Sequence, residues 1–495
     1  MPSSSIDLAQ TLAFQNNFAR LGTRFYSAVQ ASTINAPYLI AHSDSMANDL
    51  GFTVEQVRSP SFCDIFSGKQ KAVNSETLAA VYSGHQFGVW AGQLGDGRAL
   101  LLGDLPLSDQ SGRLEIQLKG AGITPYSRMG DGRAVLRSSV REFLCSEAMA
   151  ALGIATSRAL CITGSDQYVM REQPEKMAIV TRTAKSFIRF GSFEHWYYQG
   201  QSQELQMLAD FVINNYYPHL QNNEHPYQAL LRTVVESTAD LMACWQAVGF
   251  MHGVMNTDNM SILGLTLDYG PFGFMDGFDP EHVCNHSDDQ GRYAFHMQPR
   301  IGQWNCHALA QALLPLIGSV EATQEALSCY VPRFEQSYQH KLRSKFGLIT
   351  VQDGDTHLFD DFFSIMALGQ TDFTLAFRYL SQLEHRDPCK DEVLRDLFIN
   401  RAQLDAWLVH YRTRLAQENS VDTQRHAQMK QVNPKYILRN YLAQQAIAAA
   451  EQKDFSEIAK LLKVLEHPFD EQEENERYAA LPPEWASRLS VSCSS

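Results

Sequence analysis

The sequence has no long apolar run, no excess of positive charge and no closely paired cysteines. No apolar stretch of its 495 residues reaches the length of a membrane span, and residues 1–7 lack the basic and apolar regions of a signal peptide. We therefore expect a cytoplasmic protein without membrane contact. Only 41 Lys and Arg stand against 55 Asp and Glu, a net charge of −14. This balance argues against a general nucleic-acid-binding surface and leaves room only for a local anion site.

The nine cysteines are scattered, with no Cys-x-x-Cys spacing of the kind that zinc sites and thioredoxin-like centres use. Cys493 differs from the others because it lies in a polar terminal stretch, where we expect an exposed thiol. Hydrophobic residues make up 44% of the chain and charged residues 19%, which is typical of a packed protein. The length suits two to four domains or one two-lobed catalytic unit.

Two glycine-rich turns with the same four letters stand out in the first third of the chain. Gly95-Asp-Gly97-Arg98 precedes a strand-like run at 99–102, and Gly-Asp131-Gly132-Arg recurs at 130–133. Glycines let a backbone approach phosphate groups, and arginine adds a forked donor. The alternative is a pair of ordinary hairpin turns. Between them, residues 114–119 alternate like a half-buried strand that ends in Lys119, in position to meet a phosphate.

Residues 138–152 have helical spacing, with Glu142 at the border of the apolar face. Lys119 and Glu142 therefore suit the ion pair between a strand lysine and a helix glutamate that aligns phosphates in kinase-like folds. Ser139-x-x-Glu142 is also a capping box, in which the carboxylate would bind a backbone N–H at the helix start. We favour the ion pair because the lysine, the glycine turns and an acidic loop follow one another in kinase order.

That acidic loop is the stretch 252–270, which joins two acids and a carboxamide to apolar residues. His252 and Asn259 have the spacing of the kinase catalytic loop, and Asp268-Tyr-Gly stands where kinases have Asp-Phe-Gly. Asn259 and Asp268 are thus candidate ligands of a divalent cation. The position of the kinase base is occupied by Val254, and Asp258 is the nearest replacement. The alternative is ordinary turn chemistry.

Strand-like segments at 159–163, 168–172 and 178–183 lead to Arg182 and Arg189, which either bind phosphate or pair with surface acids. From about 203 the pattern becomes helical, including 226–251 and further amphipathic stretches to 418. Residues 420–435 are polar and predict a linker, and a last helix pair covers 436–451 and 455–465.

These motifs together resemble the selenoprotein O (SelO, YdiU) family of protein adenylyltransferases. The resemblance covers most of the chain and rests on Tyr-Ser-Gly-His-Gln-Phe-Gly at 82–88, Gly-Asp-Gly-Arg at 95–98, Gln-Leu-Lys-Gly-Ala-Gly at 117–122, Gly-Asp-Gly-Arg-Ala-Val-Leu-Arg at 130–137, and His-Gly-Val-Met-Asn-Thr-Asp-Asn-Met at 252–260. It implies an α+β, protein-kinase-like two-lobed fold (a pseudokinase) that binds ATP in a flipped orientation and transfers AMP to protein hydroxyls.

The resemblance also implies a division of the chain and a set of site residues. We expect an N-terminal helical extension at 1–60, a β-rich N-lobe at 61–200, a helical C-lobe at 201–420, and C-terminal helices with a redox tail at 421–495. Asp258 would accept the proton, Asn259 and Asp268 would bind Mg²⁺ or Mn²⁺, and Glu142 would position Lys119. The residues expected to hold the nucleotide are Gly95, Gly97, Arg98, Lys119, Asp131, Gly132, Arg182, Arg189 and Asp268.

Many eukaryotic members of that family have selenocysteine near the C-terminus, where this chain has Cys493. With Cys284 in a polar stretch sixteen residues after Asp268, the resemblance suggests a regulatory Cys284–Cys493 disulfide. The expected partners are proteins that offer Ser, Thr or Tyr hydroxyls, and the expected state is a monomer. Three alternatives remain open: a kinase, a protein uridylyltransferase that uses UTP and Mn²⁺, and a non-catalytic nucleotide-binding scaffold.

Overall fold

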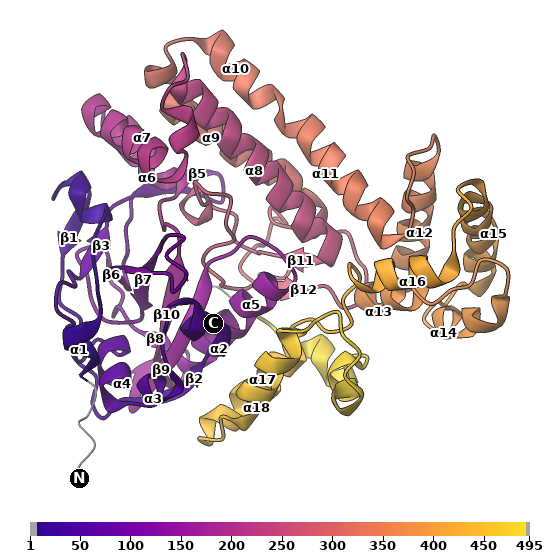
Figure 1. The fold of residues 1–495 in the computed structure, drawn as a ribbon, viewed down its shortest axis with the longest axis horizontal. Coiled ribbons are helices and arrows are strands. Elements are labelled where there is room, and N and C mark those ends of the chain that lie inside the picture. Colours follow the sequence, from indigo (N-terminus) through magenta and orange to yellow (C-terminus); the bar gives the residue numbers. More distant parts are fainter. Residues whose placement is uncertain (1–6, 492–495) are drawn as a thin grey trace.

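The computed structural model describes residues 7–491 and is built around one antiparallel sheet (Figure 1). Its strands run in the order β1 (Tyr26–Ala28), β3 (Leu78–Ala80), β6 (Ala99–Pro106), β7 (Arg113–Lys119), β10 (Pro174–Ala184), β9 (Arg158–Met170) and β2 (Tyr38–His42), and β8 (Ala134–Val135) pairs with β10. Lys119 at the end of β7 is in register with Ala99 of β6 and Val180 of β10. The strand end that carries the predicted phosphate-binding lysine therefore lies in the middle of the sheet.

Residues 159–163 and 168–172 belong to one strand rather than two. The chain stays extended between them because Gly164 pairs with Ala178 of β10, and a register shift beyond Ala178 lets the hairpin continue to Met170. The expectation of separate strands was wrong, because β9 runs without a break from Arg158 to Met170.

We expected residues 1–60 to form a helical extension, but the described part of this segment contains strands as well as helices. They contain short helices, α1 (Leu8–Thr11), α2 (Asp44–Asp49), α3 (Val54–Val57) and α4 (Pro60–Phe66, which ends the region). They also supply β1 and β2, the two outermost strands of the sheet. Strands of three and five residues are too short to show a clear period in the sequence.

The helix α5 (Leu136–Ala151) packs on β9 and β10 and is itself covered by α17 (Asn440–Glu451) and α18 (Ser456–Leu465) (Figure 1). Because it is covered from both sides, charged residues of α5 such as Glu142 and Glu147 are buried. Buried charges require partners, and those of Glu142 lie in the site described below.

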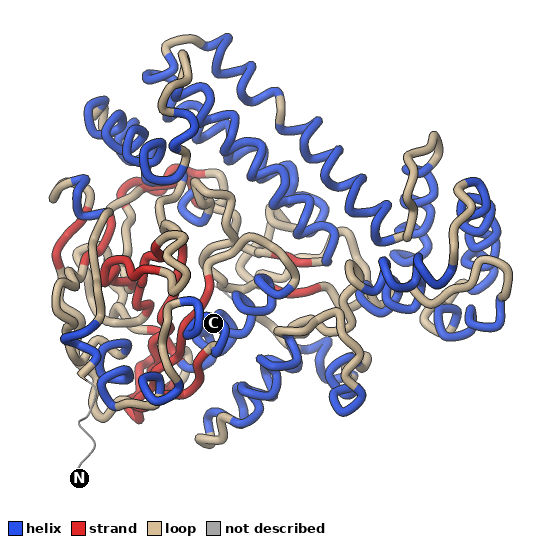
Figure 2. Tube along the Cα trace, in the orientation of Figure 1, coloured by secondary structure: helices blue, strands red, loops and turns tan. Residues whose placement is uncertain are grey.

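Helices make up most of the rest, and strands gather on one side of the molecule (Figure 2). The first group is α6 (Phe190–Tyr198), α7 (Ser202–Tyr216), α8 (Pro226–Val248), α9 (Gln298–Ile317), α10 (Val320–Ser328) and α11 (Tyr330–Lys345). The second is α12 (Asp355–Gly369), α13 (Phe373–Leu380), α14 (Asp391–Arg395), α15 (Arg401–Gln417) and α16 (Asp422–Lys430). The second group packs around a core rich in aromatic residues, among them Phe362 and Trp407, which Phe346 at the end of α11 also joins. Within residues 7–491, no helix is both long and apolar enough to cross a membrane.

The predicted polar linker at 420–435 is wrong for its first half, which forms α16. Its buried Arg425 donates hydrogen bonds to the carbonyl of Leu383 and to Asp422, at 2.5 and 2.6 Å. A helix held by a buried arginine has almost no apolar stripe, so its sequence looks like a linker.

The loop that contains His252 lies between two short paired strands. The helix α8 ends at Val248, and Gly249 takes a left-handed conformation that turns the chain into β11 (Phe250–Met251). β11 pairs with β12 (Gly273–Phe274), so residues 252–272 form a closed loop whose two ends are held together. The fold is therefore a mixed α and β structure in which this loop faces the sheet.

Candidate active site

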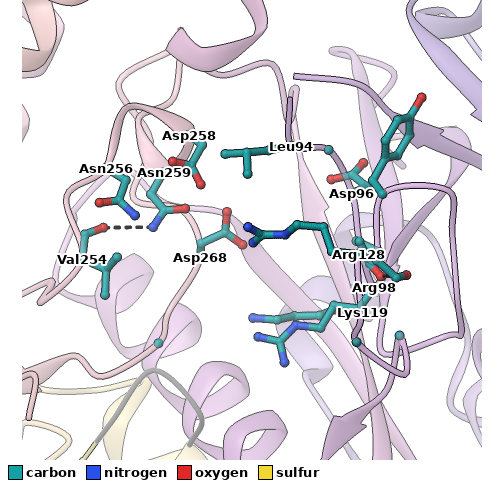
Figure 3. Close-up of a pocket in the computed structure, with 18 of the residues that line it drawn as sticks. Leu94, Asp96, Arg98, Lys119, Arg128, Val254, Asn256, Asp258, Asn259 and Asp268 are labelled. Atoms are coloured by element: carbon teal, nitrogen blue, oxygen red, sulfur yellow. Dashed lines mark hydrogen bonds between the residues drawn. The ribbon is translucent and has the colours of Figure 1, made fainter. Parts of the chain in front are cut away.

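A cavity of about 850 Å³ lies between the sheet and the 252–272 loop. In Figure 3, Arg98, Lys119 and Arg128 extend from the sheet side, while Asp258, Asn259 and Asp268 extend from the loop. All the residues expected to bind nucleotide or metal line this cavity: Gly95, Gly97, Arg98, Lys119, Asp131, Gly132, Arg182, Arg189, Asp258, Asn259 and Asp268. Glu142 lies directly behind Lys119.

Three cations and two carboxylates form one continuous chain of ion pairs across the back of the cavity. Lys119 Nζ donates to Glu142 Oε2 at 2.5 Å, and Arg182 donates to the other oxygen of Glu142. Arg182 also reaches Asp268 at 2.7 Å, and Arg189 pairs with the second oxygen of Asp268. The two predicted arginines are thus bound to the site rather than to surface acids.

Glu142 is not a helix cap. The helix α5 begins at Leu136 with Val135 as its N-cap, so Ser139 lies inside the helix and the capping-box alternative does not apply. Burial alone would raise the pKa of Glu142, but Arg182 and Lys119 bring that pKa below its ordinary value. Glu142 is therefore a buried anion whose role is to hold two cations.

The ammonium group of Lys119 loses its proton more easily in this site than in water. Burial, with Arg182 close by, lowers the pKa of Lys119 to about 8, although Glu142 acts in the opposite direction. For Asp268, burial would raise the pKa, but Arg189 and Arg182 hold that pKa well below its ordinary range. Asp268 is thus an anion, and each of its two oxygens is paired with one arginine.

The direction of the Asp268 side chain is set by its own backbone conformation and by contacts to the residues before it. Its own φ is +57°, a left-handed conformation that is uncommon for a residue with a side chain and frequent at functional sites. His252, stacked on Trp245, contacts the carbonyl of Leu267 with Nε2 at 2.7 Å, and Trp245 donates to Thr266 at 3.0 Å. The histidine of the loop is thus a support for the turn at Asp268.

Asn259 and Asp268 present oxygen atoms to the same space. The amide nitrogen of Asn259 donates to the carbonyl of Val254 at 2.9 Å, which leaves the amide oxygen directed toward Asp268 (Figure 3). An amide and a carboxylate oxygen suit Mg²⁺ or Mn²⁺, which take their remaining ligands from water and phosphates. No cluster of three His, Cys, Asp or Glu side chains able to hold a metal occurs in residues 7–491. The donor set fits a cation that arrives with a nucleotide.

Asp258 lies at the other end of the loop side. Gln86 donates to Asp258 Oδ2 at 3.2 Å, while Oδ1 is buried without a hydrogen-bond partner among the described residues. Burial raises the pKa of Asp258 to about 6, against the lowering effect of Arg189. Arg189 also donates to the backbone carbonyl of Asp258 at 2.6 Å, which fixes the loop to the arginine. The carboxylate of Asp258 thus lines the cavity with Gln86 on one oxygen and with the other oxygen packed against Gly84, where a Cβ would come within 3.0 Å.

The two glycine turns are close contacts between loops. A Cβ on Gly95 would collide with the ring of Tyr126, and one on Gly132 would collide with the backbone of Gly122. Asp131 is exposed and binds Arg171 at 2.7 Å, so its carboxylate belongs to the rim of the cavity. The two glycines thus let neighbouring loops pack closely, and these loops form one wall of the cavity.

Several lining residues were missed in the sequence. Asp96 stands between the two predicted glycines, and burial raises its pKa to about 6 while Arg189 opposes this. Gln86 and Tyr82 come from the stretch 82–88, and the ring of Tyr82 lies 4.8 Å from the Arg189 guanidinium. Arg128 belongs to the segment between the two glycine turns. A glutamine and a tyrosine carry no signal of their own, whereas Asp96 could have been found from its motif.

Cys284 does not line the cavity. Its Sγ lies next to Gly253, where a Cβ would come within 2.8 Å, so it touches the back of the 252–272 loop. The N–H of His286 donates to the carbonyl of Val491 at 3.0 Å, which brings the last described residue beside this segment. Cys493 lies outside the described residues, and the disulfide stays a prediction.

Comparison with known proteins decides the family. The family model described as "Protein adenylyltransferase SelO" matches residues 8–466. The chain belongs to the SelO family. It is 59% identical to the protein nucleotidyltransferase YdiU of Herminiimonas arsenicoxydans, over 97% of this chain and 96% of that protein. The YdiU proteins of Burkholderia multivorans and Paraburkholderia xenovorans are each 53% identical, over 99% and 100% of this chain and 97% and 98% of theirs. This SelO-family chain is an enzyme, a nucleotidyltransferase.

Proposed function

We propose that this enzyme transfers AMP from ATP to Ser, Thr or Tyr hydroxyls of other proteins and releases pyrophosphate. The observation that carries the proposal is the arrangement of the cavity, with Lys119, Arg182 and Arg189 at its back and Asp258 at its side. The residue at the kinase base position, Val254, has no proton acceptor in its side chain. The cations suit a polyphosphate, and the carboxylate of Asp258 is offset from the kinase position.

The arginines and Lys119 are proposed to hold the β- and γ-phosphates, which leave as pyrophosphate. Asp268 now neutralises Arg182 and Arg189, so phosphates that take over these arginines would release Asp268 to a cation. Asn259 and Asp268 would hold Mg²⁺ or Mn²⁺. When bound, that ion supplies positive charge to the phosphate oxygens and so stabilises the leaving group.

Asp258 is proposed as the proton acceptor. The hydroxyl oxygen of the substrate protein forms a bond to the α-phosphorus as the bond to the bridging oxygen of pyrophosphate breaks, and the hydroxyl proton goes to the carboxylate of Asp258. Gln86 donates to Oδ2 of Asp258 and so orients the carboxylate for this transfer.

The proposed architecture is a kinase-like, two-lobed pseudokinase. Residues 61–200 form the N-lobe with β7 and α5, and residues 201–420 form the C-lobe with the 252–272 loop. Segment 421–495 adds the helices that cover α5, and segment 1–60 completes the sheet of the N-lobe. The ion pair from β7 to α5 and the loop held by β11 and β12 support this division.

The proposal is tested with ATP labelled at the α- or the γ-phosphate, incubated with a bacterial lysate. We expect protein-bound label from the α position only. Label from γ would identify a kinase, label from α-labelled UTP with Mn²⁺ in preference to ATP would identify a uridylyltransferase, and no label would identify a scaffold. Asp258→Ala should retain ATP binding and lose transfer, whereas Asp268→Ala should lose metal-dependent binding as well. The opposite pattern would refute the two roles.

A further inference from the structure

A two-stranded hairpin lies beside the catalytic loop, and apart from Gln86 it has no role in the chemistry described so far. It consists of β4 (Ser83–Gln86) and β5 (Val89–Gln93). The N–H of His85 donates to Thr257 Oγ1 at 2.7 Å, the N–H of Phe87 donates to Asn256 Oδ1 at 3.1 Å, and Gln86 binds Asp258. The inner strand and the turn are thus fixed to three consecutive residues of the loop.

The outer strand, β5, is an open edge. In the part of the chain that the structure describes, β5 pairs only with β4, and Val89 is 70% exposed. Charges and prolines are two of the ways in which proteins protect an exposed edge, and the sequence of β5, Val-Trp-Ala-Gly-Gln, has neither. The register shift of this strand pair lies between Ser83 and His85 of β4. An exposed edge of this kind can bind an extended segment of another chain as an added strand.

The direction of the backbone groups follows from the register. Gln86 and Val89 flank the two-residue turn and exchange hydrogen bonds, so the next pair, His85 and Trp90, directs its backbone groups outward. On the inner side this is observed, because the outward N–H of His85 binds Thr257. On the outer side, the N–H and C=O of Trp90 therefore face the open edge.

The edge is held rigidly by the side chains beneath it. The rings of Trp90 and Tyr198 lie 4.0 Å apart, and the ring of His85 lies 5.2 Å from Trp90. His85 is bound in turn by the buried Glu194 at 2.5 Å. A preorganised strand loses little entropy when it binds a partner.

Both ends of β5 lead into the cavity. Phe87, before the strand, and Leu94, after it, line the cavity together with Asp258. β5 therefore runs along the rim, next to the proposed proton acceptor.

We propose that an extended segment of the substrate protein pairs with β5 as a third strand, and that this pairing brings its hydroxyl to Asp258. The inference rests on the proposed function, since it presumes a protein acceptor. Backbone pairing accepts many sequences, with the side chains beside the hydroxyl left to provide selectivity. The predicted mode of recognition is thus an extended, solvent-exposed region of the substrate rather than a folded surface.

The test uses a library of synthetic twelve-residue peptides, each with one Ser, Thr or Tyr, and α-labelled ATP. In the best acceptor, N-methylation of single backbone amides should reduce transfer at every second position, because only alternate N–H groups of a strand face its neighbour. Val89→Lys should lower kcat/KM for the peptide at least tenfold and leave the Kd for ATP within twofold. Val351→Lys is the matched control, since Val351 is 73% exposed in a distant loop.

The outcomes separate this inference from the proposed function. If the parent labels lysate proteins but no peptide, or if N-methylation shows no alternation and Val89→Lys behaves like Val351→Lys, β5 is not the docking edge while the proposed function stands. If the parent labels neither peptides nor lysate proteins from α-labelled ATP, the proposed function fails and takes this inference with it.

Discussion

The Glu142→Gln substitution offers the sharpest test of the ion-pair chain. The side chain of Glu142 is 2% exposed and accepts hydrogen bonds from Lys119 and Arg182. A glutamine of the same shape keeps one acceptor but turns an N–H₂ toward the other cation and removes the charge. Breaking a buried pair in this way costs about 3–5 kcal/mol of the free energy of unfolding. A lysine that is no longer held in place should also lower the transfer rate by about 10²-fold.

Glu147→Gln is the matched control on the same helix. Glu147 is equally buried and accepts from Arg158 at 2.7 Å, from Ser43 at 2.6 Å and from the N–H of Ala159 at 3.0 Å, away from the cavity. Urea unfolding should show similar losses of stability in both variants. Single-turnover transfer at saturating ATP should fall only in Glu142→Gln. Equal transfer rates in the two folded variants would mean that Glu142 is structural and does not position Lys119.

Two further predictions concern pH and redox state. Burial lowers the pKa of His195 from 6.5 to about 4, and its Nδ1 and Nε2 lie within hydrogen-bond distance of Ser83 and Gln199. Because the unfolded chain binds this proton more tightly, the contribution of His195 to stability is present above pH 6.5 and is lost as the pH falls toward 4. The free energy of unfolding should therefore fall by about 2 kcal/mol between pH 7 and pH 5. Urea unfolding of His195→Gln should not show this decrease. After treatment with oxidised glutathione, non-reducing peptide mapping should show a Cys284–Cys493 linkage, and reductant should raise activity in the parent but not in Cys493→Ser; no linkage would refute the tail lock.

The site was easier to predict from the sequence than its surroundings. Lys119, Glu142 and Asp268 follow one another in kinase order, which predicted that they lie together, and the structure joins them through Arg182. The sequence could not distinguish Arg182 and Arg189 from surface arginines, because burial of an arginine depends on partners that are far away along the chain. Gln86 acts through a single contact with Asp258, and no pattern announces such a contact.

Errors in the fold have the same origin in long-range contacts. The helix α16 was taken for a linker because Arg425, rather than an apolar stripe, attaches it to the protein. Residues 159–163 and 168–172 were expected as separate strand-like segments, although pairing of Gly164 and Tyr168 with β10 makes them one strand. Long helices such as α8 were predicted close to their observed bounds, because their apolar residues recur at helical spacing within one continuous stretch.

The two outermost strands of the sheet, β1 and β2, both come from the first 42 residues of the chain. During synthesis these strands leave the ribosome first, yet β2 must wait for β9, more than a hundred residues later, before it has a neighbour. Each of them is an edge strand of the sheet, so a shortened product that starts after His42 would expose β3 and β9 as new edges. Initiation at an internal codon, or clipping by a protease, would thus turn the enzyme into a chain that is prone to aggregate from two sides.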